Sequence, residues 1–584
     1  MKNKYMKAII SATTLLFIAT SCGEDFLYKA PQGSIDDAAL ANEQGVDLLV
    51  TNAYANLSEN GWGASVFNWA LGGIYGGDAN KGSDAGDQSV LNSLETYALL
   101  TTNSYVSEKW DWIYKGSKRV AMAFKALNNT TDIDPAIATS RKGELHFLRA
   151  MFYYEGLKVF GPYIPYIDES HQENDPKVHN DKDIYNDVLA DADKAIANLP
   201  NTQSEPGRVN AYAAKMLKAK ILLQKGDYAA AKPIIKDVLD NGVTSFGKKY
   251  GLADDMSANW DSFRDNTSPE SIWEIQFSAD GPNDNGNAGM SLCYPHNTGP
   301  GGCCGFYQPS FELANSFKVN EDGLPYLNGE YRSGESVSYN ASTNGTEIVS
   351  NTTIAVDPRL DFSIGRIGIP YKDHGLADQG WIRDANNGGF FIPKKHVYSK
   401  AEADAGLGRS GMYAGWAPGS AMNIQYLSVR DAMLLYAECL ANDGELAPAM
   451  DLVNKIRTRA GNEVNIIKNE DGTPASNYKV STYSAAHSAF TDKATCIKAI
   501  RMERKLELAM EGVRFFDLNR WGGEYMAKEL GDYVDYEKKY ISKFAGAAHL
   551  AANKTMFPIP QTQIQTMGND ESGQPFLVQP APWK

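Results

Sequence analysis

Residues 501–522, RMERKLELAMEGVRFFDLNRWG, are the stretch that decides the fold. They continue a helical pattern over residues 493–512, in which apolar residues stand among charged ones. We expect the charged side chains of this helix to point outward; they are Glu503, Arg504, Lys505 and Glu507. Glutamates recur at every fourth residue here. That spacing predicts a helix face with salt bridges rather than a pair of catalytic acids.

Two other stretches share the plan of helix, tight turn and helix. Residues 213–242 turn at a Gly-Asp pair, and residues 431–461 turn at an Asp-Gly pair. Both look like tetratricopeptide hairpins, whose paired helices bury one another's apolar faces when they stack. Apolar residues at three- and four-residue steps predict further helices over residues 106–127 and 135–160.

A long stretch of different composition separates these helical segments. Residues 243–424 are rich in Gly, Asn, Ser, Asp and Pro, with short strand-like runs at residues 271–278 and 348–356. Loops of this length inside a compact protein usually carry function.

These patterns together predict a mainly α protein with a single domain over residues 41–584. A tetratricopeptide-like scaffold of helical hairpins spans residues 41–242 and 425–584. The loop-rich excursion over residues 243–424, with its short strands, is expected to form the ligand face.

The N-terminus is typical of a secretory signal. Three lysines precede an apolar run that is too short to span a bilayer. The run ends in Ala-Thr-Ser-Cys, which resembles a bacterial lipobox. We predict a lipoprotein signal peptide over residues 1–21, lipidation at Cys22 and a lipid-anchored linker over residues 22–40. The alternative is a signal peptide with a chance cysteine near its end.

The charge balance excludes one class of partner. The chain has 56 Lys and Arg against 71 Asp and Glu, a formal net charge of -15. Binding to nucleic acid needs clusters of Lys and Arg that neutralise phosphates, and the sequence has none beyond the dispersed charges of surface helices. We therefore expect no nucleic acid, and contact with a membrane through the lipid anchor alone.

Five segments share their order along the chain with a known family. They are residues 22–31 (CGEDFLYKAP), 144–165 (ELHFLRAMFYYEGLKVFGPYIP), 357–360 (DPRL), 501–522 and 557–560 (FPIP). In these segments the chain resembles the SusD/RagB family of glycan-capture lipoproteins of Gram-negative bacteria. The resemblance implies a tetratricopeptide-rich body, a lipid anchor on the outer face of the outer membrane, and a SusC-like TonB-dependent transporter as partner. It implies no catalysis.

Candidate glycan contacts follow from the chemistry of sugars. Sugar rings stack their apolar faces on aromatic side chains, and their hydroxyls pair with Asn, Asp, Gln and Arg. Three loop regions offer both kinds of residue. The candidates are Trp62, Asp78 and Asn80 in the first region, Tyr294, Cys303, Cys304, Phe306 and Tyr307 in the second, and Trp381, Arg383, Tyr413 and Trp416 in the third. For Trp62 the alternative is a place in the core, and for Arg383 an ordinary surface position.

The adjacent Cys303 and Cys304 allow two disulfide arrangements. A bond between the neighbours would close a small ring and make a rigid apolar platform for a sugar. Alternatively, either cysteine pairs with Cys293 as a loop staple. Cys22 aside, five cysteines leave at least one thiol free, and Cys439 is the natural candidate for a buried one.

No residue pattern predicts a metal or cofactor. The acidic loops are compatible with a structural Ca²⁺, but no ligand spacing picks out a site, and no cofactor is expected. The sequence also has no linear motif of a metalloprotease, a serine hydrolase or a phosphate-binding loop.

We therefore expect a non-enzymatic surface lipoprotein that captures an oligo- or polysaccharide and delivers it to a SusC-like transporter. The glycan is unknown; a flat loop site for a compact sugar unit suggests a fructan as one guess. One alternative is a tetratricopeptide adaptor that binds proteins or peptides, as in the RagB branch. Another is a surface glycoside hydrolase, for which the many acids supply no discriminating pair.

Overall fold

The computed structural model describes residues 40–58, 61–171, 176–279, 286–342 and 347–584. The predicted signal peptide, Cys22 and all but the last residue of the predicted linker lie outside the described residues.

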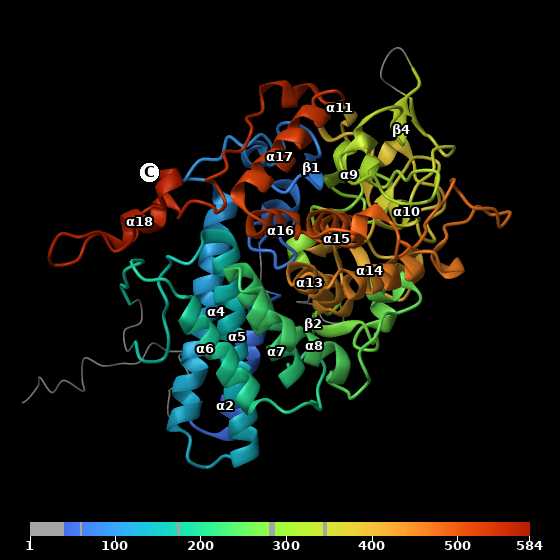
Figure 1. The fold of residues 1–584 in the computed structure, drawn as a ribbon. Helices are drawn as coiled ribbons and strands as arrows, with labels where there is room; N and C mark the ends of the chain where they lie inside the picture. The colour runs from blue at the N-terminus through green and yellow to red at the C-terminus, as the bar shows by residue number, and fades with distance from the viewer. Residues whose placement is uncertain (1–39, 59–60, 172–175, 280–285, 343–346) are drawn as a thin grey trace, which may run out of the picture.

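An N-terminal set of long helices forms one side of the molecule (Figure 1). The set consists of α2 (Glu43–Ala55), α4 (Ser104–Asn129), α5 (Pro135–Phe160), α6 (Tyr185–Asn198), α7 (Ala211–Lys225) and α8 (Tyr228–Asn241). From α4 to α8, each helix packs on the next one along the chain. The connections from α4 to α5 and from α7 to α8 are short, which favours antiparallel helical hairpins.

Local sequence explains where the two longest helices begin and end. Asn103 caps α4 by accepting hydrogen bonds from the backbone N–H groups of the first turn. Asp134 caps α5 in the same way, and Pro135 follows at a position where a missing N–H does no harm. Gly161 then ends α5 with a φ of 78°, a conformation that other residues rarely adopt.

A second set of helices continues the first. It consists of α13 (Val429–Asn442), α14 (Leu446–Ala460), α15 (Lys493–Glu507), α16 (Arg514–Arg520) and α17 (Gly523–Glu537). Helix α13 packs against α8 as well as against α14 and α15. The hairpins α7–α8 and α13–α14 turn at the predicted glycines, Gly226 and Gly444, which have φ values of 87° and 82°. The prediction of a mainly α fold with tetratricopeptide-like hairpins is confirmed.

Most of the short antiparallel strand pairs lie within the loop-rich region. Within the described residues they pair β1 (Ala79–Gly82) with β3 (Phe306–Pro309), β2 (Ser271–Ile275) with β10 (Ile424–Ser428), β4 (Ser338–Asn340) with β5 (Ile348–Ser350), β6 (Ile364–Gly365) with β7 (Ile392–Pro393), and β8 (Gly408–Tyr413) with β9 (Ala417–Ser420). The pairing of β2 with β10 brings the two ends of the excursion together.

Short helices link these strands and close the chain. They are α3 (Asn92–Glu95), α9 (Phe311–Ser316), α10 (Arg359–Ser363), α11 (Ala385–Gly388), α12 (Lys400–Asp404) and α18 (Gln561–Met567), with a π-helical turn at Trp69–Ile74. One large apolar core contains residues of both helix sets and of the excursion, and a smaller cluster around Tyr371 lies within the excursion alone.

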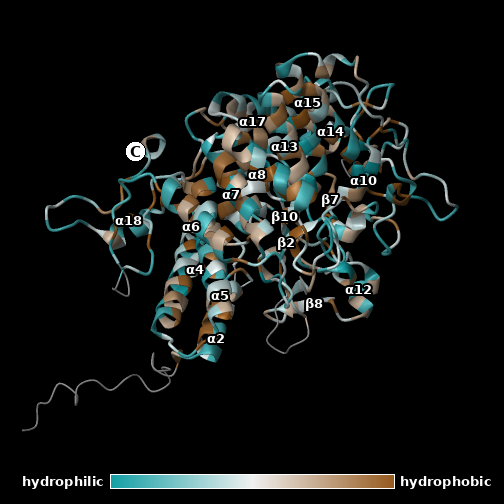
Figure 2. Cartoon of the chain, turned by 60° about the horizontal axis from the view of Figure 1, so that its bottom comes forward, coloured by the Kyte–Doolittle hydropathy of each residue, from teal (hydrophilic) through white to brown (hydrophobic). Residues whose placement is uncertain are grey.

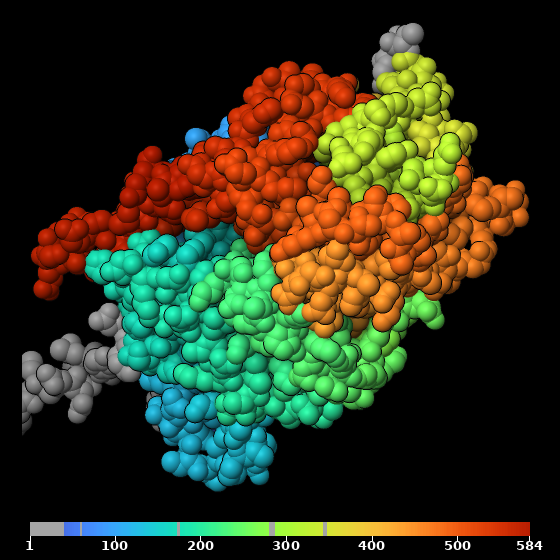
Figure 3. Space-filling view, viewed as in Figure 1, coloured from blue at the N-terminus to red at the C-terminus, as the bar shows by residue number. Residues whose placement is uncertain are grey.

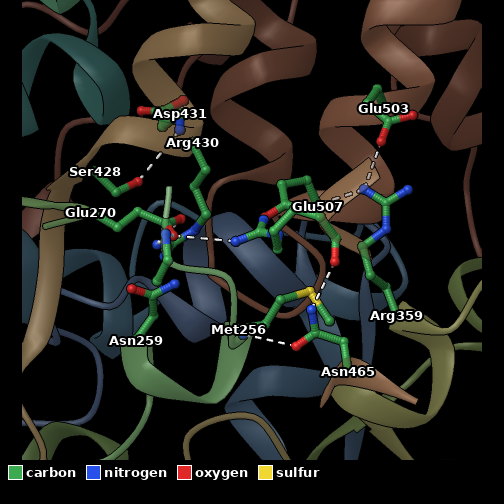
Figure 4. A network of polar contacts seen from close by, with 12 residues as sticks. Met256, Asn259, Glu270, Arg359, Ser428, Arg430, Asp431, Asn465, Glu503 and Glu507 are labelled. Carbon is green, nitrogen blue, oxygen red and sulfur yellow. Dashed lines mark hydrogen bonds and ion pairs between the residues drawn. The ribbon is translucent and has the colours of Figure 1, made fainter. Parts of the chain in front are cut away.

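The charged residues of α15 lie in the interior, so the prediction that they point outward is wrong. Glu503, Arg504, Lys505 and Glu507 are each 6% exposed or less. Both glutamates lie close to Arg359 of α10, with N–O distances of 2.6 and 3.0 Å (Figure 4). Arg359, which belongs to the excursion, therefore supplies positive charge to two carboxylates of a scaffold helix.

The same network of ion pairs continues to α14, α13 and the start of β2. Arg459 pairs with Glu507 and also, at 3.2 Å, with Glu270, which Arg430 contacts at 3.2 Å as well. Burial by itself would raise the pKa of Glu507, but Arg459 and Arg359 hold that pKa at about 2. The carboxylate is thus ionised inside the protein.

Replacing Glu507 by Gln should destabilise the protein by roughly 3–5 kcal/mol at pH 7, because Arg459 and Arg359 would keep their charges without this partner. The pKa of Glu507 is lower in the folded protein than its ordinary value of 4.5. Its contribution to stability is therefore complete above that value and is lost as the pH falls toward 2. Urea denaturation should show the difference between wild type and Glu507→Gln shrinking over that interval.

Asp404→Asn is a matched control, because Asp404 forms an exposed pair with Lys400 on α12. Such surface pairs contribute little to stability, so this variant should follow the wild type at every pH. A difference between wild type and Glu507→Gln that stays constant down to pH 2 would contradict the depressed pKa.

Candidate functional site

Three aromatic side chains from two distant parts of the chain meet at the surface. Trp62 lies edge-on to Tyr413, with ring centroids 6.5 Å apart, and edge-on to Trp416 at 6.3 Å. Trp416 is 53% exposed, whereas Trp62 and Tyr413 are half-buried. The indole N–H of Trp62 donates to the Ser291 hydroxyl at 2.9 Å, which fixes the ring. We call Trp62, Tyr413 and Trp416 the aromatic cluster.

A tight hairpin turn holds Trp416 in its exposed position. Ala414 and Gly415, which join β8 to Trp416 and β9, have φ values of 52° and 78°. A glycine suits such a conformation, while an alanine is strained in it. Figure 2 shows β8 at the margin of the molecule, away from α13, α14 and α15. The turn therefore exposes an indole ring on a short, defined hairpin.

The structure joins Cys303 to Cys304 and leaves Cys293 as a buried free thiol. Of the two arrangements that the sequence allowed, it contains the vicinal one. Both bonded cysteines are half-buried. Their loop lies beside β8, because Ser410 donates its hydroxyl to the carbonyl oxygen of Gly301 at 2.7 Å. Ser410 and Tyr413 both belong to β8, so this strand contacts the disulfide loop and also carries part of the aromatic cluster.

A polar group lies on the other side of the disulfide loop. Arg383 pairs with Asp84 at 2.6 Å and with Asp87 at 2.7 Å, and its side chain is 35% exposed. Backbone N–H groups of Asp87 and Gly86, together with Arg383, hold the pKa of Asp84 below its usual range. A side chain added at Gly305, next to the disulfide, would come within 3.8 Å of the Cβ of Arg383. The aromatic rings, the disulfide and the paired charges thus belong to neighbouring segments, and we refer to them together as the aromatic face.

Six of the predicted contact residues lie inside the protein, which corrects the prediction that they meet a ligand at the surface. Each is 8% exposed or less; they are Asp78, Asn80, Tyr294, Phe306, Tyr307 and Trp381. The other candidates among the described residues, Trp62, Cys303, Cys304, Arg383, Tyr413 and Trp416, retain exposed surface.

The strand pair β1–β3 explains why Asp78, Asn80, Phe306 and Tyr307 are buried. Asn80 donates to Glu537 of α17 at 3.0 Å and accepts from the Tyr533 hydroxyl at 2.9 Å. The ring of Tyr307 lies so close to Gly73 that the glycine has no room for a side chain. These residues of β1 and β3 therefore lie under α17 and the π-helical turn.

Tyr294 and Trp381 belong to the smaller apolar cluster of the excursion. Trp381 stands edge-on to Tyr371 at 5.3 Å, and Tyr294 lies 5.4 Å from Tyr398. These rings hold the excursion together from within and have little surface left for a ligand.

Three polar residues of the face, Ser410, Asp84 and Asp87, were not among the predicted contacts. Ser410 stands in β8, and the two aspartates stand in a loop whose sequence resembles other polar loops of the chain. Only their contacts with Gly301 and Arg383, far away in the sequence, give them a place at the site.

In the part of the chain that the structure describes, no group of three or more His, Cys, Asp and Glu side chains is arranged to hold a metal ion. Nor does any described helix have the length and apolar character needed to cross a bilayer.

The fold defines the class: a scaffold of helical hairpins with a long, loop-rich insertion that carries exposed aromatic side chains. The family model described as "SusD family" matches residues 269–571, which is more than half of the chain. A second model, described as "Starch-binding associating with outer membrane", matches residues 25–223. The chain belongs to the SusD family.

Similar proteins agree with this assignment. A SusD-like protein of Bacteroides ovatus is 24% identical over 295 residues, which are 47% of this chain and 50% of the relative. SusD-like protein P25 of Formosa agariphila is 22% identical over 88% of this chain and 89% of its own length. The chain thus spans about half the length of the Bacteroides ovatus relative, and most of the length of P25.

Solved structures share the fold. A SusD superfamily protein from Bacteroides vulgatus has a TM-score of 0.66 at 18% identity, covering 93% of this chain and 99% of that one. Surface glycan-binding protein A from Bacteroides thetaiotaomicron, solved in complex with laminarihexaose, has a TM-score of 0.61 at 17% identity, covering 92% and 99%.

Thiol labelling tests the vicinal disulfide. In protein of residues 23–584, unfolded without reductant, three cysteines should react with iodoacetamide: Cys293, Cys439 and Cys496, all free and buried in the folded structure. Reduction should add two more labels, on Cys303 and Cys304. Mass spectrometry then counts the labels on the protein before and after reduction.

Cys293→Ser is the matched variant for this test. It should lose one label and keep the Cys303–Cys304 bond. A peptide cross-linked through Cys293 in the wild type would show that the loop staple forms instead.

Proposed function

We propose that this protein binds a glycan on the face made by the aromatic cluster, the Cys303–Cys304 disulfide and Arg383. The observation that carries the proposal is Trp416, an indole that is 53% exposed on a defined hairpin turn, with Trp62 edge-on to it and Tyr413 edge-on to Trp62. Large exposed aromatics usually mark binding sites, and an indole offers a flat apolar surface that the C–H groups of a sugar ring can cover.

Each part of the face has a distinct task in this proposal. Trp416 stacks on a ring face, Trp62 supports it edge-on, and Tyr413 in turn packs against Trp62. The disulfide adds a second apolar contact beside β8. Arg383, with Asp84 and Asp87, offers donors and acceptors to hydroxyl groups at the far end of the face. Because the side chains are already held by their neighbours, binding requires little ordering.

The charges of the face favour binding over hydrolysis. A glycosidase needs a carboxylic acid whose pKa is raised so that it can donate a proton. Here hydrogen bonds and Arg383 lower the pKa of Asp84, and Arg383 engages both acids of the group. We therefore propose a role without catalysis.

The membership of the SusD family supports a cellular role for this binding. We propose that Cys22 carries the lipid anchor, that the protein sits on the outer face of the outer membrane, and that it passes the glycan to a SusC-like TonB-dependent transporter. The "associating with outer membrane" description of the second family model supports this location. The proposal names no single glycan. One structural neighbour is described as a laminarin-binding SusD-like protein, so laminarin is tested together with fructans.

Trp416→Ala should weaken glycan binding by roughly 1–3 kcal/mol, because it removes the stacking surface without touching the core. Purified residues 23–584 are first titrated against soluble levan, inulin, laminarin and other polysaccharides by affinity electrophoresis and calorimetry. The variant is then measured with the glycan that binds.

Tyr339→Ala is the matched control, since Tyr339 is 45% exposed on β4 and, among the described residues, makes no ring contact with the aromatic cluster. It should bind like the wild type. Full affinity in Trp416→Ala would remove the aromatic cluster from the site. Released reducing ends would point to a hydrolase, and peptide binding without any glycan binding to an adaptor.

A further inference from the structure

A cavity of about 280 Å³ lies between α15, α17 and residues 327–332. In Figure 2, α15 and α17 lie at the top of the molecule and β8 at the bottom, so this cavity is separate from the aromatic face. Figure 3 shows the yellow-green surface that includes residues 327–332 meeting the orange and red surfaces of α15 and α17 on the visible face.

The lining of this cavity is strongly basic in a chain with a net charge of -15. Six cationic side chains contribute to it; they are Arg332, Lys498, Arg501, Lys505, Arg514 and Lys528. Glu529 is the only acid among the lining residues, and it pairs with Arg514 at 3.2 Å. A hollow lined by one sign of charge focuses the electric field and raises the local concentration of oppositely charged ligands.

Carboxylates behind the lining offset part of this charge. Glu312 pairs with Arg332 and Lys505, at 2.8 and 3.1 Å. Asp532 pairs with Lys528 at 2.8 Å and with Arg332 at 3.2 Å. Together with Glu529, three carboxylates face six cations, so the cavity retains an excess of positive charge.

Arg501 and Lys498 are the two lining cations that make no ion pair with a described residue. The exposed Lys498 donates to the Asn328 side chain at 3.1 Å, whereas the buried Nε of Arg501 has no hydrogen-bond partner. The guanidinium of Arg501 is therefore the less satisfied of the two. This guanidinium lies 4.2 Å from the ring centre of Tyr525 and 4.8 Å from that of Trp521. The two rings hold the guanidinium plane in place while part of the side chain remains accessible at the cavity.

We propose that this cavity binds a carboxylate-bearing monosaccharide unit, such as a hexuronic acid. A guanidinium held on aromatic rings is suited to a planar carboxylate, which accepts two parallel hydrogen bonds from it. Met502 and Tyr525 line the same cavity, are half-buried and offer apolar surface to a ring. The volume lies just under the range of about 300–1,000 Å³ for drug-sized ligands, which fits one sugar ring rather than an oligomer.

Calorimetric titration of residues 23–584 with sodium glucuronate, at constant ionic strength, tests the proposal. Glucose is the neutral counterpart with the same ring, and sodium sulfate is an oxyanion without a ring. Saturable binding is expected for glucuronate, weaker binding for sulfate and none for glucose. The affinity for glucuronate should fall as salt is raised, because the attraction is electrostatic.

Arg501→Gln should weaken glucuronate binding about tenfold or more, and Lys498→Gln, at the exposed end of the cavity, by a smaller factor. Arg264→Gln removes one arginine charge far from this cavity and should leave binding unchanged. Trp416→Ala should also bind glucuronate normally, so failure of this site and failure of the aromatic face are distinguishable. Thermal melts confirm that each variant is folded.

Three outcomes would overturn the proposal. The first is equal binding of glucuronate and glucose, because charge would then play no part. The second is sulfate binding as tight as that of glucuronate, which would show a site for an inorganic anion alone. The third is unchanged glucuronate affinity in folded Arg501→Gln.

Discussion

Glu503 and Glu507 of α15 are carboxylates buried inside the protein, and arginines from two other segments supply their counter-charges. Burying an ion costs several kcal/mol unless opposite charge and hydrogen bonds replace the lost water. Arg359 comes from the excursion, and Arg457 and Arg459 come from α14. An arrangement that separates these segments would leave a buried charge without a partner. The ion pairs therefore select one packing of scaffold and excursion among those that bury similar apolar area.

The rigidity of the aromatic face follows from this packing. Glu270, just before β2, pairs with Arg430, just after β10, so the network also holds the two strands that close the excursion. The chain between β2 and β10 is thus fixed at its ends by a strand pair and in its middle by Arg359. The hairpin of β8 and β9 is built on this frame. Binding at its exposed tryptophan therefore does not carry the free-energy cost of ordering a long loop.

The scaffold could be predicted from sequence because its signals are local: glycine turns, capping residues and apolar spacing within one helix. The site could be predicted only in part. Trp416 stands in a glycine-rich turn, but Asn80 and Tyr307 stand in similar surroundings and are buried, because Tyr533 and Gly73 cover them. The same limit applies to α15. Its glutamate spacing fits an exposed ladder and a buried network equally well, and the deciding partner of Glu503, Arg359, lies 144 residues away.

The two faces of α15 show how one helix serves two different environments. Glu503 and Glu507, four residues apart, project to one side, where arginines neutralise them inside the protein. Lys498, Arg501 and Lys505 follow one another at three- and four-residue steps and line the basic cavity beside α17. Because the acids of this helix are already paired with arginines of other segments, they do not neutralise its own cations. The excess positive charge at the cavity is therefore a direct result of the ion pairs that fix the fold.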